Sequence, residues 1–180
     1  AFGACALLAT SCNKNDIIES LAQNEGRLSF NTALGKQTKA AELMNTSLQT
    51  AANTASNGIA LYTYQETATA GTYTRWFNDS LYYSGGSWAI TSTRFRNPAA
   101  TKYVTYFPKG NVTEVTGSFA GATFATADKT PQFKYTIQSV DSQEDLVAGI
   151  TSVAANKTDI VVGMRHILSQ VNFGVKGYKG

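Results

Sequence analysis

Residues 159–177 read DIVVGMRHILSQVNFGVKG, and this stretch decides how the rest of the chain is interpreted. Ile160, Val162 and Met164 alternate with the residues between them, which is the period-two pattern of a β-strand. In the second half, hydrophobic side chains occupy every other position from 171 to 175. A strand with one apolar and one polar face buries only one side, so we expect a two-layer β structure with a shared core.

The composition favours one β domain of an extracellular type. The chain has 180 residues, of which 15% are charged, and a formal net charge of +3. This length allows a buried core without metals or disulfides. The charge is too small to predict a nucleic-acid surface, so no nucleic-acid partner is expected. Nine Tyr, nine Phe and fifteen Gly against a single His suit a β protein better than a metabolic enzyme.

The chain opens with an apolar run of small residues, AFGACALLA at positions 1–9, which is too short to span a bilayer as a helix. The sequence ATSC follows at positions 9–12 and is similar to the bacterial lipobox, in which the cysteine is acylated and becomes the mature N-terminus. We therefore expect residues 1–12 to be part of a lipoprotein signal peptide and Cys12 to carry lipid. The alternative is a buried N-terminal strand.

Residues 13–27 are polar and are predicted to be a tether between the anchor and a folded domain at residues 28–180. The domain starts with an alternating strand candidate that ends at Gly35. Its alternating residues are Leu28, Phe30, Thr32 and Leu34.

The body of the domain reads as short strands separated by turn signals. The predicted strands are residues 59–64, 73–77, 80–83, 88–90, 102–107 and 133–137. Gly85 and Gly86 give the strongest hairpin signal, because paired glycines supply the positive φ of tight hairpin turns. Residues 40–55 are expected to form a loop with at most a turn or two of helix, and residues 111–128 a loop or a weak edge strand.

Residues 144–148 (EDLVA) and 164–173 (MRHILSQVNF) resemble the end of the N-terminal domain in the Bacteroides fimbrillin family, the lipoprotein pilins and fimbrial tip proteins of Bacteroidales. The family pattern there is a polar residue and Asp-Leu-hydrophobic-Ala, a short loop, a hydrophobic strand, then His-x-Leu-Ser-Gln-hydrophobic-x-Phe. Trp88 in a hairpin and the aromatic strand at 103–108 also fit the family. With the lipobox-like start, the resemblance spans most of the chain.

The resemblance implies an antiparallel β-sandwich of Greek-key, transthyretin-like type, with about seven strands and little helix. In the family a second sandwich domain follows, so the chain is expected to be a fragment of a longer protein. The implied function is that of a structural subunit or tip adhesin of surface fimbriae, not an enzyme and without cofactor or metal. The implied partners are other fimbrial subunits and the outer membrane, through the lipid anchor at the cell surface.

The resemblance also implies a maturation step. In the family an Arg- or Lys-specific protease cuts after the first strand and removes the lipidated leader. Here Lys39 is the first candidate for this cut and Arg27 the second, although the family more often has Arg at the former place. Removal of residues 28–34 would leave unpaired backbone groups, which a strand from another subunit can fill.

The alternative function is a lipid-anchored surface sandwich that keeps its first strand and binds a host glycan or protein without polymerising. Its ligand would be held by exposed aromatic side chains, although aromatic residues in strands are more often core or cross-strand pairs. The candidates are Trp76, Tyr82, Tyr83 and Trp88.

The sequence offers no catalytic or metal site. His166 and Ser169 are three residues apart, but a triad also needs an acid oriented on the histidine and an oxyanion site, so a structural role for His166 is favoured. A single His cannot build a zinc site with one remaining Cys. The acidic residues around Asp145 are expected to solvate a loop. Asp79-Ser80-Leu81 resembles the short O-glycosylation motif of Bacteroidetes, which makes Ser80 a candidate site.

Overall fold

The computed structural model describes residues 26–35, 45–116, 119, 131–139 and 144–167, and the structural statements below concern these residues. They form β-strands and one short helix. The elements are β1 (Ser29–Leu34), α2 (Asn45–Ala51), β2 (Ile59–Glu66), β3 (Tyr73–Ser84), β4 (Ser87–Ile90), β5 (Thr101–Phe107), β6 (Val112–Glu114), β7 (Phe133–Tyr135), β8 (Val147–Val153) and β9 (Asp159–His166).

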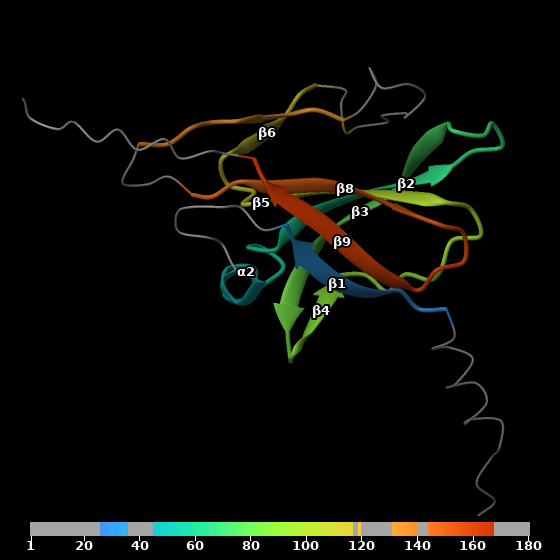
Figure 1. The fold of residues 1–180 in the computed structure, drawn as a ribbon, viewed down its shortest axis with the longest axis horizontal. Helices are drawn as coiled ribbons and strands as arrows, with labels where there is room; N and C mark the ends of the chain where they lie inside the picture. The colour runs from blue at the N-terminus through green and yellow to red at the C-terminus, as the bar shows by residue number, and fades with distance from the viewer. Residues whose placement is uncertain (1–25, 36–44, 117–118, 120–130, 140–143, 168–180) are drawn as a thin grey trace, which may run out of the picture.

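Seven of the strands close into a barrel in the order β1-β4-β3-β2-β5-β8-β9. Figure 1 shows β1 lying between β4 and β9, where it completes the ring. Neighbouring strands are antiparallel except for β1 and β9, which are parallel. The predicted antiparallel β-sandwich of Greek-key, transthyretin-like type is therefore wrong, although the all-β class is right. The difference arises because β1 pairs on both sides, so the sheet closes on itself instead of forming two open layers.

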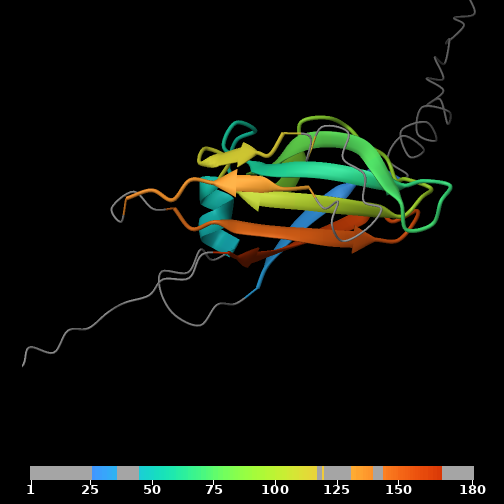
Figure 2. The ribbon, with the colours of Figure 1, turned by 90° about the horizontal axis from the view of Figure 1, so that it is seen from above.

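The barrel interior is filled by the inward positions of the strands. On β9, Ile160, Val162 and Met164 are buried and the residues between them are exposed, as the alternation predicted. Figure 2 shows α2 standing across one end of the barrel, and Leu48 and Ala52 are fully buried there. A helix this short is unstable by itself, so this burial holds it in place.

A second, smaller core lies on the outside of the barrel. The ribbon of β6 and β7 covers the outer faces of β2 and β5. The Tyr106 and Phe133 ring centres are 5.1 Å apart, and those of Tyr62 and Phe119 are 4.3 Å apart. β5 is consequently buried on both faces, with Tyr103 in the barrel core and Val104 in the outer core.

The predicted hairpin at Gly85 and Gly86 is confirmed. Both glycines have positive φ, 60° and 84°, and they connect β3 to β4 where Ser84 pairs with Ser87. β3 runs without interruption from Tyr73 to Ser84, so two predicted strands form one.

No helix within the described ranges is both long and apolar enough to cross a membrane.

β8 is the strand that the sequence pattern did not predict. It pairs with β5 along its length and with β9 near its start, where Val147 faces His166. Further along, Gly149 and Gly163 bring the two backbones unusually close. A Cβ atom on Gly149 would lie 2.0 Å from the Gly163 carbonyl oxygen, whereas a Cβ on Gly163 would meet only Thr151 Oγ1, at 3.8 Å.

Candidate functional site

β1 is the strand that the sequence predicted to be removable, and it is attached firmly to β9. Six consecutive residue pairs join the strands in parallel, from Ser29 opposite Asp159 to Leu34 opposite Met164. The Ser29 hydroxyl also donates to Asp159 Oδ1 at 2.5 Å. The side chain of Phe30 is buried, and its ring lies edge-on to Tyr103 with centres 6.0 Å apart. Leu28 is also buried, whereas Thr32 and Leu34 are half-buried.

On its other side β1 is held at only two points. Phe30 pairs with Trp88 of β4, and Arg27 forms an isolated bridge with Phe95. At this bridge the Leu28 amide donates to the Arg94 carbonyl at 2.8 Å. Between the two points the chain that follows β4 moves away from β1, so this seam is the loosest in the barrel.

The carboxylate of Asp79 on β3 holds the chain that follows β4. It accepts hydrogen bonds from the backbone amides of Ser80, Thr91 and Ser92 at 2.7, 3.0 and 3.1 Å, and from the Thr91 hydroxyl. Burial by itself would raise the pKa of Asp79, but these four hydrogen bonds outweigh it, so the pKa lies below its ordinary value.

Substitution Asp79→Asn is expected to destabilise the protein by about 1–3 kcal/mol at pH 7, because the amide group cannot accept all four hydrogen bonds. A depressed folded-state pKa contributes stability above the unfolded-state value, ordinarily 3.8, and this contribution is lost as the pH falls through the folded-state pKa. The difference between wild type and variant should therefore shrink below about pH 4. Urea unfolding between pH 7 and pH 2 measures it, and a difference that stays constant would contradict the role of the charge.

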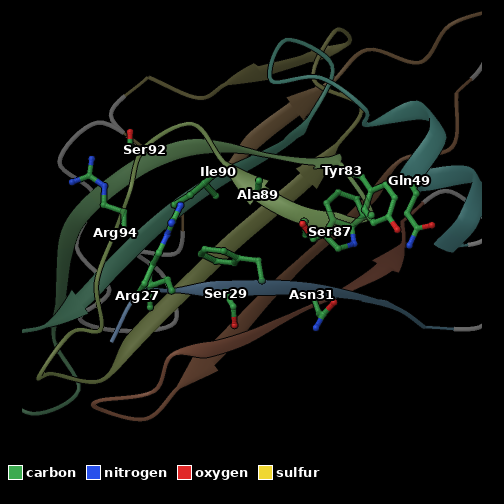
Figure 3. A pocket seen from close by; sticks show the side chains of 14 residues that line it. Arg27, Ser29, Asn31, Gln49, Tyr83, Ser87, Ala89, Ile90, Ser92 and Arg94 are labelled. Carbon is green, nitrogen blue, oxygen red and sulfur yellow. The ribbon is translucent and has the colours of Figure 1, made fainter. Parts of the chain in front are cut away.

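A hollow of about 630 Å³ opens along the β1–β4 seam. Figure 3 shows side chains from β1, β4 and the following segment around it, with Gln49 of α2 and Tyr83 of β3 at one end. Buried Phe30 and Trp88 contribute to its wall, and polar side chains such as Asn31 and Ser92 line it as well. The gap between β1 and the chain that follows β4 is therefore a concave, mostly polar surface.

Of the other residues predicted to take part in maturation, the structure describes only Arg27. Cys12 and Lys39 lie outside the described residues. Arg27 is exposed, but its backbone is paired with Phe95 and the next amide is bonded to Arg94. A protease must bind its substrate in an extended, unpaired form, so the peptide bond after Arg27 is poorly presented for cleavage.

The hydroxyl of Ser80, the predicted O-glycosylation site, is already engaged. It donates to the Ala55 carbonyl at 2.6 Å and lies 3.0 Å from Lys109 Nζ, which also donates to Ala55. Burial lowers the pKa of Lys109. Glycosylation of Ser80 stays a prediction, and it would require these contacts to break.

The aromatic residues suggested for ligand binding do not form one exposed platform. Trp88 is only 7% exposed and packs edge-on against Tyr83, with ring centres 5.5 Å apart. Trp76 is half-buried against Phe77, and Tyr82 is half-buried on β3. Of these residues, Tyr83 and Trp88 line the hollow at the seam.

The structure supplies an acid for His166 that sequence reasoning missed. His166 Nδ1 lies 2.5 Å from Asp145 Oδ2, and the histidine side chain is buried. The two residues are brought together because His166 pairs with Val147, just after Asp145. Nothing in the local sequence indicates this pairing. The buried ring ties the end of β9 to the start of β8, and Ser169 lies outside the described residues.

Among the described residues, no three His, Cys, Asp or Glu side chains gather closely enough to hold a metal ion. No protein-family model, curated protein or solved structure matches this chain.

Proposed function

We propose that the chain is a structural subunit or tip component of surface fimbriae, exported as a lipoprotein acylated at Cys12. Subunits would join when a protease releases β1 and a strand from another subunit takes its place. The proposal starts from the resemblance of residues 144–148 and 164–173 to the Bacteroides fimbrillin family. Its partners would be other subunits and, before cleavage, the outer membrane.

The position of β1 is the observation that supports this proposal most. β1 closes the barrel, and the chain between it and α2 contains Lys39. A cut at Lys39 would separate β1 from every other strand of the barrel. Loss of β1 would then expose backbone groups along β9 and β4 and empty the places of Leu28 and Phe30 in the core. An incoming strand can satisfy both requirements by β-strand addition.

The geometry favours Lys39 over Arg27 for this step. A cut after Arg27 would leave β1 attached to the rest of the domain through the following chain. The bond after Arg27 is also held between the bridge to Phe95 and the hydrogen bond to Arg94. Only cleavage beyond β1 opens the barrel.

The second candidate function is a lipid-anchored surface protein that keeps β1 and binds a host glycan or protein. The six parallel pairs between β1 and β9 favour it, because they resist removal of the strand. The hollow at the β1–β4 seam gives such a protein a concave binding surface, and it requires β1 to stay in place.

Brief trypsin treatment of the lipoprotein, followed by unheated denaturing gels and mass spectrometry, distinguishes the two candidates. Strand exchange predicts a ladder of detergent-resistant oligomers whose subunits start just after Lys39. A Lys36→Gln/Lys39→Gln variant is the matched control, because trypsin then lacks a site between β1 and α2, and it should stay monomeric. A wild-type monomer that still carries residues 28–34 would contradict strand exchange and favour the anchored binding protein.

A further inference from the structure

The hollow at the β1–β4 seam carries positive charge without negative charge among its lining residues. Arg27 and Arg94 both line it, and no Asp or Glu does. The contact between His166 and Asp145 involves neither arginine, and neither arginine has an acidic partner among the described residues. An opening whose charges are guanidinium groups attracts anions, and guanidinium pairs especially well with carboxylate and sulfate oxygens.

The two arginines are placed differently. Figure 3 shows the Arg27 side chain leaving the start of β1 and crossing the gap toward Ile90 of β4. Arg94 lies at the end of the gap, where its Cζ is 4.7 Å from the centre of the Phe77 ring. Its buried Nε has no hydrogen-bond partner among the described residues. Arg27 is therefore placed to contact a ligand directly, whereas Arg94 adds charge from the end of the opening.

Neutral polar groups and aromatic rings complete the surface. The amide side chains of Asn31 and Gln49 line the hollow and form no hydrogen bond with the described residues. The half-buried ring of Tyr83 contributes aromatic surface at the same end, where it packs against the buried Trp88. Amides pair with hydroxyl groups, aromatic rings pack against the apolar faces of sugar rings, and the volume is in the range of small-ligand sites.

We propose that this hollow binds an acidic saccharide, a short sugar chain that carries carboxylate or sulfate groups. Arg27 pairs with the acidic group, and Asn31 and Gln49 bind hydroxyl groups. An acidic peptide fits less well, because strand addition needs an uninterrupted free strand edge, and the part of the chain that lines the hollow at β1 is already paired at Arg27 and at Phe30.

The site is complete only while β1 is seated in the barrel, because Arg27 and Asn31 belong to that strand or its start and the opposite wall belongs to β4. A ligand that spans the seam therefore binds the closed barrel alone and stabilises it by mass action. This inference does not depend on strand exchange, and the intact, uncleaved chain is the form in which it is tested.

Isothermal titration of the intact chain tests the proposal with a hyaluronan tetrasaccharide, which has carboxylates only, and a chondroitin sulfate tetrasaccharide, which also has sulfates. We expect saturable binding of at least one of them, a higher melting temperature in its presence, and weaker binding to maltotetraose. Arg27→Gln should raise the dissociation constant by about tenfold or more. A hydrogen bond to a charged group contributes at least roughly the free energy that corresponds to a tenfold change in affinity. Comparing the two acidic sugars identifies which anion is preferred.

The matched control is Arg165→Gln, which removes the same charge at an exposed position of β9 that does not line the hollow. It should leave binding unchanged. The proposal would be overturned by an equal loss in both variants, which means nonspecific attraction, or by no binding of either acidic sugar. Binding of tetraglutamate or inorganic sulfate as tight as that of the sugars would also overturn the assignment to a saccharide.

Discussion

Replacing Gly149 with alanine is expected to destabilise the protein by about 3–5 kcal/mol or to prevent folding. The added methyl group would lie 2.0 Å from the Gly163 carbonyl oxygen and 3.1 Å from Met164 Cα. Both are backbone atoms, so no side-chain rotation can relieve the contact, and β8 and β9 would have to separate. Urea unfolding followed by tryptophan fluorescence measures the change in the free energy of unfolding.

Gly163→Ala is the control for this prediction, since it adds the same methyl group to the same pair of strands. There the nearest atom is Thr151 Oγ1 at 3.8 Å, an ordinary contact, and the hydrogen bond from the Gly163 amide to Thr151 can remain. We expect a change of less than about 1 kcal/mol. Similar losses in the two variants would show that the close approach of the backbones is not what requires glycine at position 149.

Replacing Phe30 with alanine is expected to cost about 3–5 kcal/mol, because it leaves a cavity in the barrel core next to Tyr103 and Trp88. The neighbouring variant Asn31→Ala changes an exposed side chain on the same strand and should stay within about 0.5 kcal/mol of wild type. Equilibrium unfolding in urea compares them.

The same pair of variants reports how β1 is held. If Phe30 anchors the strand, the Phe30→Ala protein should exchange the β1 amide hydrogens faster than wild type, while Asn31→Ala should not. Equal stability of the two variants would mean that the hydrogen bonds to β9 retain β1 without help from the core.

The local elements were predictable because their signals are local. Alternation at Ile160, Val162 and Met164 marks β9, and positive φ at Gly85 and Gly86 marks the hairpin. β8 was missed for a physical reason. Its first residues are buried on both sides and Gly149 interrupts the pattern, so alternation is lost where the strand packs most closely.

Barrel closure could not be predicted, because an alternating strand looks the same in a sandwich and in a barrel. The distinction depends on which strands β1 pairs with, and the sequence carries no local mark of its register with β9. The candidate site could not be predicted for the same reason. The hollow is bounded by Ser92, which Asp79 holds across the hairpin, and both this contact and the pairing of His166 with Asp145 depend on strand register.

The parallel pairing of β1 with β9 also bears on folding kinetics. Ser29 and its partner Asp159 are 130 residues apart in the chain. Contacts of such large sequence separation form late, because the entropy of closing the loop is lost before the contact is gained. A chain made from its N-terminus can therefore complete the contacts among β2, β3, β4, β5 and β8 before β9 is available to pair with β1. The barrel should close in the slowest step, and until then the nascent chain displays open strand edges on which a chaperone can act.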